Sequence, residues 1–187
     1  MSMDKYICVY KDGFPKELCE ELINIFDTNT EYQHDGHIGV GYKPDVKKTK
    51  DMHSWDAPVL EQYNKIIWKC LNDKLLKYYE SFKCDNINIF PADTHDTGYQ
   101  IQKYKQNDGE YKWHTDQWVG KEGARVLTFL FYLNDVDEGG ETQILDYKIK
   151  PEAGKLLLFP PFFKYIHRGN IPISSDKYIV TGWLHAK

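Results

Sequence analysis

The sequence predicts an α+β protein in which helices come first and an antiparallel pair of sheets follows. Helical periodicity is confined to the N-terminal part of the chain, while short β-type runs fill the C-terminal part. The strands are not separated by helices, and this order favours antiparallel pairing over alternating βαβ units. We therefore expect helices packed against one face of a sheet.

A short strand, a helix and a long loop are predicted first. Residues 5–10 alternate between apolar and polar types, as a strand does. Within residues 15–26, Leu18, Leu22, Ile25 and Phe26 fall on one helical face. Residues 27–56 contain glycines, a proline and several charges with little periodicity, which indicates a long loop with at most irregular strands.

A second, longer helix is predicted after this loop. Asp56 is suited to cap its N-terminus, and Pro58 is suited to its first turn, where no backbone N–H is needed. Apolar residues then repeat at helical spacing until about Phe82.

Five β-type runs, separated by turn residues, make up the rest of the chain. They cover residues 99–105, 124–134, 142–149, 154–159 and 177–185. A length of 187 residues suits one domain with a substantial core. We expect a single domain over 1–187, with a strand-and-helix region over about 1–98 and a strand-rich core over about 99–187.

Composition argues against some partners. A net charge of -4 offers no electrostatic footprint for a phosphate backbone, so no nucleic-acid partner is expected. Asp4 and Lys5 interrupt the N-terminus, and no apolar run reaches membrane-spanning length, which predicts a cytoplasmic protein without a membrane partner. The four cysteines form no CxxC pair, and we expect reduced thiols.

A candidate metal site begins at His114 and Asp116. Residues two apart on an extended chain point the same way, so the two side chains can converge on one ion. This spacing is common by chance, and a third ligand is needed. His167 is the candidate, because it follows the apolar run 156–159 and a Pro-Pro turn.

Two histidines and one carboxylate form a facial triad that leaves three positions of an octahedral ion open, which suits iron(II) in an oxygenase. The same ligands can hold a catalytic zinc ion, so the ligands alone leave a hydrolase open. Lys177 favours the oxygenase, because it follows His167 by ten residues at the start of the final strand.

With these residues, the segment from Tyr99 to Leu184 resembles the prolyl 4-hydroxylase-like branch of the iron(II)- and 2-oxoglutarate-dependent dioxygenases. That branch has an HxD motif, a distal histidine and a basic residue about ten positions later. The matching residues are Gln102, Tyr104, Tyr111, His114, Asp116, Arg125, Tyr132, Gly139, Gly140, Thr142, His167, Lys177 and Trp183.

The resemblance implies a double-stranded β-helix, or jelly roll, with the N-terminal helices packed on the major sheet. It implies that His114, Asp116 and His167 hold Fe(II). It also implies that Lys177 pairs with the distal carboxylate of the cosubstrate 2-oxoglutarate, with hydrogen bonds from Tyr104, Tyr132 or Thr142. A lysine inside an apolar barrel needs such an anionic partner.

The implied activity is hydroxylation of a prolyl residue in a peptide or protein, with consumption of O2, release of succinate and CO2, and ascorbate as a possible reductant. Tyr111, Arg125 and Trp183 match positions that contact the target proline in this branch. Two alternatives stay open: the same chemistry on a free amino acid or other small molecule, and a cupin-like metal hydrolase or isomerase.

Other residues receive plainer interpretations. Trp113 and Trp118 flank the metal motif, and for them we expect core packing. Surface or loop roles are expected for the remaining histidines, His34, His37, His53, His95 and His185. The Gly-rich residues 36–55 correspond to a mobile loop in related enzymes, and either a lid or a disordered connection is compatible with their composition.

Overall fold

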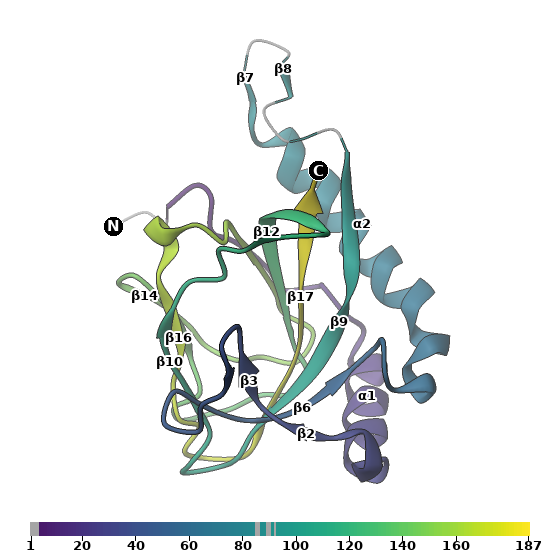
Figure 1. Cartoon of the computed structure of the whole chain (residues 1–187), viewed down its shortest axis with the longest axis vertical. Coiled ribbons are helices and arrows are strands. Elements are labelled where there is room, and N and C mark those ends of the chain that lie inside the picture. Colours follow the sequence, from purple (N-terminus) through teal and green to yellow (C-terminus); the bar gives the residue numbers. More distant parts are fainter. Residues whose placement is uncertain (1–3, 85–86, 89–90, 92) are drawn as a thin grey trace.

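Two helices cover one face of an eight-stranded antiparallel sheet in the computed structural model, which describes residues 4–84, 87–88, 91 and 93–187 (Figure 1). Helix α1 spans Lys16–Thr28, and α2 spans Asn64–Glu80. A 3-10 turn over Pro58–Tyr63 leads directly into α2, with Pro58 at its start. Shorter 3-10 turns occupy Thr30–Tyr32 and Phe163–Tyr165.

The main sheet has the strand order β1-β15-β12-β17-β9-β6-β2, with β11 paired to β12. Its strands are β1 (Cys8–Tyr10), β2 (His34–Asp35), β6 (Lys50–His53), β9 (Thr94–Tyr104), β11 (Val119–Gly120), β12 (Gly123–Tyr132), β15 (Leu156–Phe159) and β17 (Lys177–Ala186). All of these pairs are antiparallel.

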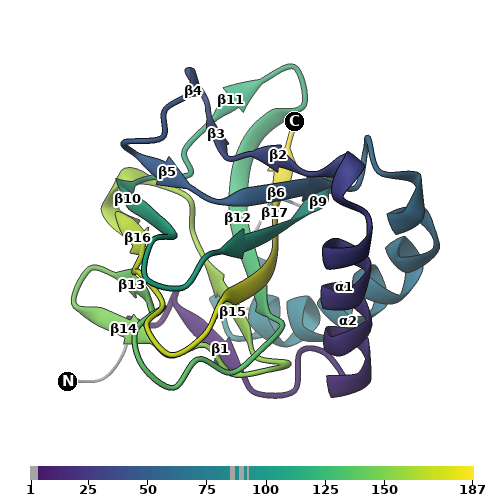
Figure 2. The same cartoon turned by 90° about the horizontal axis from the view of Figure 1, so that it is seen from below.

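A second sheet of five strands has the order β14-β13-β16-β10-β5. It consists of β5 (Lys47–Lys48), β10 (Glu110–His114), β13 (Thr142–Ile144), β14 (Tyr147–Ile149) and β16 (His167–Gly169). Figure 2 shows the helices on one side of the main sheet and this second sheet on the other. Two small hairpins complete the described strands: β3 (His37–Ile38) with β4 (Gly41–Tyr42), and β7 (Lys83–Cys84) with β8 (Ile87–Asn88).

The two faces of the main sheet contribute to two separate cores. Phe129, Phe131 and Val180 point outward and pack with the helices in the larger core. Leu130, Tyr132 and Ile179, their neighbours along the same strands, belong to the inner core between the sheets. The alternation of side chains along each strand explains this division.

The predicted fold is confirmed in its main features, with three local differences. The run 142–149 is a hairpin of two strands rather than one, with Leu145 at φ 52° in its turn. The expected loop 27–56 contains the short strands β2 to β6. Asp56 is not a helix cap: Ala57 occupies that position, and no side chain there accepts a capping hydrogen bond.

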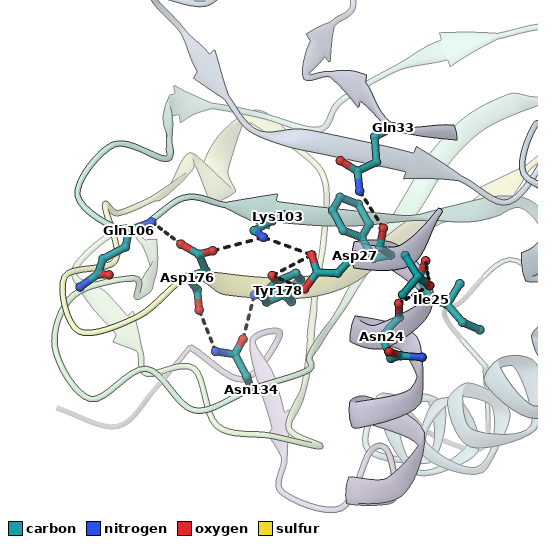
Figure 3. Close-up of polar contacts among 11 residues, drawn as sticks. Asn24, Ile25, Asp27, Gln33, Lys103, Gln106, Asn134, Asp176 and Tyr178 are labelled. Carbon is teal, nitrogen blue, oxygen red and sulfur yellow. Dashed lines mark hydrogen bonds and ion pairs between the residues drawn. The ribbon is translucent and has the colours of Figure 1, made fainter. Parts of the chain in front are cut away.

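A polar network outside the barrel ties the end of α1 to the main sheet (Figure 3). The carboxylate of Asp27 accepts hydrogen bonds from the Tyr178 hydroxyl, at 2.9 and 3.0 Å, and from Lys103, at 3.1 Å. Lys103 also pairs with Asp176 at 3.2 Å, and the Asn134 amide oxygen accepts from the Tyr178 backbone N–H. The residues on either side of Lys177 are therefore fixed from the outer face.

No helix among the described residues is long and apolar enough to cross a membrane. Cys8, Cys19 and Cys70 carry free thiols, as expected, and the side chain of Cys84 lies outside the described part of the chain. Burial raises the pKa of the Cys19 thiol to about 11, which makes it a poor nucleophile.

Candidate active site

A cavity of about 490 Å³ opens over the inner face of the main sheet. Its lining includes all three predicted metal ligands and all three predicted substrate contacts: His114, Asp116, His167, Tyr111, Arg125 and Trp183. These residues come from β10, β12, β16, β17 and the segment after β10. The fold thus brings together residues as distant in the sequence as Tyr111 and Trp183.

The predicted triad converges at the pairing of β10 with β16. His114 lies directly opposite His167 in the antiparallel register, and the two ring centroids are 4.1 Å apart. The Asp116 Oδ1 lies 3.7 Å from His114 Nε2, and its Oδ2 lies 3.5 Å from His167 Nε2. One ligand atom from each residue falls within 4.8 Å of the others, so the three side chains could hold one ion.

Backbone carbonyls fix the tautomer of both histidines. The Nδ1 of His114 lies 2.7 Å from the Lys112 carbonyl, and the Nδ1 of His167 lies 3.0 Å from the Tyr165 carbonyl. A carbonyl only accepts, so each Nδ1 donates its hydrogen, and each neutral ring presents a lone pair at Nε2 toward Asp116. These carbonyls are the outer partners that orient metal-binding histidines, and the sequence did not identify them.

The electrostatics of the cluster suit metal ligands. Burial lowers the pKa of His114, as does the neighbouring His167, so the ring stays neutral. Burial alone raises the pKa of the Asp116 carboxyl, but His167, His114 and the Trp183 indole outweigh burial and hold that pKa below its usual range. Neutral imidazoles and an ionised carboxylate are the forms that bind a cation.

Thr128 is a site residue that the sequence reasoning missed. Its hydroxyl donates to Asp116 Oδ2 at 2.9 Å, and both groups are buried. The register of β12 with β17 pairs Thr128 with Trp183, so both lie on the cavity face. Strand alternation places Thr128 on that face, but nothing in the sequence gives its partner.

Lys177 is 1% exposed and lies beside the cavity rather than in its lining, in contact with the lining residue Tyr104. Its Nζ lies over the Tyr104 ring, 4.6 Å from the centroid, and 5.7 Å from the Tyr132 ring centroid. Burial lowers its pKa to about 7, against the opposing effect of Glu141. Among the described residues no carboxylate lies within ion-pair distance of this ammonium, so it is a buried cation that an anionic ligand would stabilise.

Of the three hydroxyl residues expected near this lysine, Tyr104 and Tyr132 lie against it through their rings. Tyr104 and Thr142 line the cavity, and Tyr132 is fully buried. The Tyr104 hydroxyl donates to Gln102 at 3.2 Å. Tyr132 and Thr142 are close enough to interact, yet neither hydroxyl makes a hydrogen bond of ordinary geometry within the described residues. Of the two, only Thr142 lines the cavity.

The three predicted substrate contacts surround the metal cluster. The Tyr111 ring stacks on His114, with centroids 3.5 Å apart. The Arg125 guanidinium lies 3.5 Å above the Trp183 ring and donates to the Asp116 backbone carbonyl at 3.3 Å. A register shift between Tyr111 and His114 brings these two residues to the same side of β10.

A buried ion pair in the cavity wall was also missed. Lys47 is 3% exposed and pairs with Asp51, which also accepts from Thr49. The Lys47 Nζ lies 5.3 Å from the Tyr111 ring centroid, and Lys47 is the register partner of Tyr111 across β5 and β10. Nothing in the local sequence distinguishes Lys47 from the neighbouring Lys48, so its burial could not be predicted.

Several plainer interpretations are wrong. Trp113 and Trp118 are 42% and 50% exposed, so they do not pack in the core. Trp113 instead lies against the guanidinium of Arg168, and Trp118 lines the cavity. His185 is buried on β17 rather than at the surface.

Comparison with known proteins agrees with this geometry. Residues 99–185 match the model of the 2OG-Fe(II) oxygenase superfamily. A protein of Arabidopsis thaliana named "Probable prolyl 4-hydroxylase 3" is 25% identical over 217 residues, which cover 99% of this chain and 71% of that protein.

Two solved structures share the fold. A viral collagen prolyl hydroxylase from Paramecium Bursaria Chlorella virus-1, in complex with 2OG, superposes with a TM-score of 0.69 at 20% identity, covering 97% of both chains. A prolyl hydroxylase from Trichoplax adhaerens, in complex with a hypoxia inducible factor peptide fragment, gives 0.72 at 17% identity, covering 97% of this chain and 84% of that one.

The predicted resemblance and the predicted jelly-roll fold are therefore confirmed. The superfamily uses Fe(II), 2-oxoglutarate and O2. With its matching region over residues 99–185 and its two-histidine, one-aspartate cluster, the chain is similar to the prolyl hydroxylase-like 2-oxoglutarate-dependent dioxygenases.

Proposed function

We propose that this enzyme hydroxylates a prolyl residue within a peptide or protein, with conversion of 2-oxoglutarate and O2 to succinate and CO2. The observation that carries the proposal is the convergence of Tyr111, Arg125 and Trp183 around the His114, Asp116 and His167 cluster in one cavity. The relatives with prolyl hydroxylase names, one of them solved with a peptide, support the same substrate class.

The metal ligands in this proposal are His114, Asp116 and His167. The donor set fits Fe(II), because two neutral imidazoles and a carboxylate occupy one face of the ion and leave positions for a chelating cosubstrate and O2. When bound, the iron supplies the oxidising power to functionalise an unactivated C–H bond. Asp116 contributes the charge, and the Thr128 hydroxyl orients the carboxylate.

The cosubstrate site in this proposal is the group around Lys177. The buried ammonium pairs with the distal carboxylate of 2-oxoglutarate, and the free hydroxyls of Tyr132 and Thr142 donate to the same end. The Tyr104 ring lies against the lysine and limits its movement. These groups place the cosubstrate so that its other end reaches the metal.

The substrate-facing residues position the target ring. Tyr111 and Trp183 offer apolar surfaces to a pyrrolidine ring, and Arg125 offers N–H donors to a peptide carbonyl. The Arg125 guanidinium is already held by the Trp183 ring and by the Asp116 carbonyl, so little of its freedom is lost on binding. Ascorbate as reductant also belongs to this proposal.

The chain before residue 98 also belongs to the functional unit in this proposal. The pairing of β1 with β15 and of β6 with β9 supports a single domain over residues 1–187. His53 and Trp55 from this region line the cavity, which supports a role for residues 36–55 at its entrance.

The test is succinate production by the reduced, iron-loaded enzyme with a proline-containing peptide, followed by mass spectrometry of the peptide. We expect succinate and a mass gain of one oxygen atom in equal amounts. The same assay with free proline and other free amino acids separates the peptide from the small-molecule alternative. If 2-oxoglutarate is never consumed while the protein is folded and iron-bound, the oxygenase assignment fails, and a metal hydrolase or isomerase becomes the better account.

Lys177→Ala tests the proposed cosubstrate site separately from the metal site and the substrate contacts. We expect 2-oxoglutarate affinity to fall by about 100-fold or more, because a buried charge-assisted pair is lost. Lys148→Ala, at an exposed position on β14, is the matched control. Unchanged 2-oxoglutarate affinity in Lys177→Ala would refute the assignment of this lysine.

A further inference from the structure

A second cluster of metal-ligand type lies outside the catalytic triad. Among the described residues, two groups of three such side chains come close enough to hold an ion, and the second is formed by His34, His53 and Asp56. Its ligand atoms, like those of the triad, all lie within 4.8 Å of one another. It has the same composition as the triad, two imidazoles and one carboxylate.

Strand register creates this cluster. His34 on β2 is directly opposite Asp51 on β6, so His53, two residues further along β6, is the diagonal neighbour of His34 on the same face. That face is the cavity face, because Asp51 is opposite Gln102 and Gln102 is opposite Ile179. β2 is the edge strand of the sheet, which leaves the cluster at the rim (Figure 2).

Asp56 completes the cluster through the turn after β6. Backbone bonds from Asp56 and Ala57 to the His53 carbonyl, at 3.3 and 3.0 Å, fold this turn back over the strand end. The Asp56 carboxylate makes no helix cap. Its Oδ2 instead lies 3.4 Å from His34 Nε2 and 3.4 Å from His53 Nδ1.

The contact of His53 with Asp56 is a long hydrogen bond, and both 3.4 Å distances also equal the spacing of two ligands on one ion. Charge-assisted hydrogen bonds are typically about 2.7–2.9 Å long. Two ligands on a tetrahedral zinc ion, with bonds of about 2.0–2.2 Å, are about 3.3–3.5 Å apart. The two imidazole planes are nearly parallel, at 19° with centroids 5.6 Å apart, and one ring nitrogen of each lies within 4.8 Å of the other and of an Asp56 oxygen.

We propose that His34, His53 and Asp56 form a second divalent metal site, of zinc type, at the rim of the active-site cavity. The His34 and Asp56 side chains are 44% and 40% exposed, so an ion has access from solvent and water completes its coordination. The ion cross-links β2 to the turn after β6. This proposal does not depend on the substrate of the enzyme.

The site is connected to the cavity through Trp55. The Trp55 ring stacks on His53, with centroids 4.4 Å apart at 10°, and both residues line the cavity. Binding at His53 therefore restrains a 60% exposed tryptophan at the cavity entrance. It also fixes the strand that leads into the β3–β4 hairpin, since β3 follows β2 after one residue.

The first test counts bound zinc by equilibrium dialysis and elemental analysis. The metal-free wild type should bind two zinc ions, and His34→Ala and Asp56→Asn should each bind one. In His114→Ala/His167→Ala, which removes the catalytic cluster, we expect one ion, and none after His34→Ala is added. His37→Ala and Asp35→Asn are matched controls, since they remove an exposed imidazole and an exposed carboxylate nearby.

The second test uses tryptophan fluorescence, which does not require the double variant to fold. Zinc should change the emission of the wild type in two steps, and the step that His34→Ala removes should also be absent in Trp55→Phe, which still binds two ions. A His34→Ala variant that binds as many zinc ions as the wild type would overturn the proposal and leave the cluster as an ordinary surface group.

Discussion

The two faces of the main sheet differ in how their buried polar groups are satisfied. On the outer face, the Tyr178 hydroxyl donates a hydrogen bond to Asp27, and the neighbouring side chains are apolar and packed against helices. On the inner side, the Tyr132 and Thr142 hydroxyls have no ordinary hydrogen bond within the described structure, and Lys177 has no carboxylate partner there.

This contrast separates stability from function. An unsatisfied buried polar group costs about 1–3 kcal/mol, and a buried charge costs more. A fold keeps such groups where a ligand satisfies them, and the closely packed outer face compensates for their cost. We therefore expect inner-face substitutions to lower activity without lowering stability, and outer-face substitutions to lower stability with little effect on activity.

His167→Ala should show the largest difference between an effect on activity and an effect on stability. We expect turnover to fall by at least about 1000-fold, roughly 4 kcal/mol in the barrier, because a metal ligand is lost. The melting temperature without metal should stay close to that of the wild type. Succinate production and thermal unfolding of the same preparation measure both. Substantial turnover by the variant would remove His167 from the metal site.

Leu158→Ala tests the opposite face. Leu158 is fully buried on β15 in the outer core, and its truncation should lower the free energy of unfolding by about 2–5 kcal/mol. Urea denaturation measures this loss. The folded fraction should keep its KM for 2-oxoglutarate, and a large increase in that KM would mean that the two faces are not independent.

Lys177→Met should stabilise the ligand-free protein, by roughly 2–5 kcal/mol below pH 7. The folded pKa of this lysine is lowered to about 7 from 10.5, so the unfolded state holds the additional proton between these values. The cost of burying the charge is complete below pH 7 and decreases as pH rises to 10.5. The stability difference between variant and wild type should follow this curve, and a difference that is independent of pH would contradict it.

The same lysine predicts how 2-oxoglutarate affinity depends on pH. The distal carboxylate of 2-oxoglutarate pairs with the ammonium form of Lys177. In the free enzyme this lysine loses its proton as the pH rises through its pKa of about 7. We expect the Kd to increase up to tenfold per pH unit above pH 7, until the pKa of the bound state is reached. Calorimetric titration at several pH values measures this slope, with Lys177→Met as the control that should lack it.

Tyr178→Phe should give the smallest effect. It removes the hydrogen bonds to Asp27 shown in Figure 3 and should lower the free energy of unfolding by about 1 kcal/mol. Turnover should stay within about twofold of the wild type, because the ring still packs against Phe26. A large loss of activity would mean that the outer network positions Lys177.

The sequence was most informative where a pattern has one structural solution. Alternation predicted that Lys177 and Trp183 share a face of β17, and the family motif predicted the triad, which the structure gathers in one cavity. Partners that depend on long-range register were not predictable. The Thr128 bond to Asp116 and the pairing of Lys47 with Asp51 both depend on which strands meet.

Asp56 shows how a local signal can mislead. An aspartate before Pro58 is the usual signature of a helix cap, yet its carboxylate turns toward two histidines instead. The competing partners come from β2 and β6, whose proximity no local pattern encodes. The exposed Trp113 and Trp118 were mistaken for core residues for a related reason, since a large apolar ring fits a cavity wall, as Trp118 does, or the side chain of an arginine, as Trp113 does, as well as a core.

The position of β17 has a consequence for how the protein is made. Strands β9 and β12 leave the ribosome first, but they never pair with each other, because β17 lies between them. Until residues 177–186 emerge, both strands expose unpaired edges that invite association with other chains. Lys177 arrives with the strand that closes this gap, so a nascent chain acquires the lysine proposed to bind the cosubstrate and its continuous sheet in the same step.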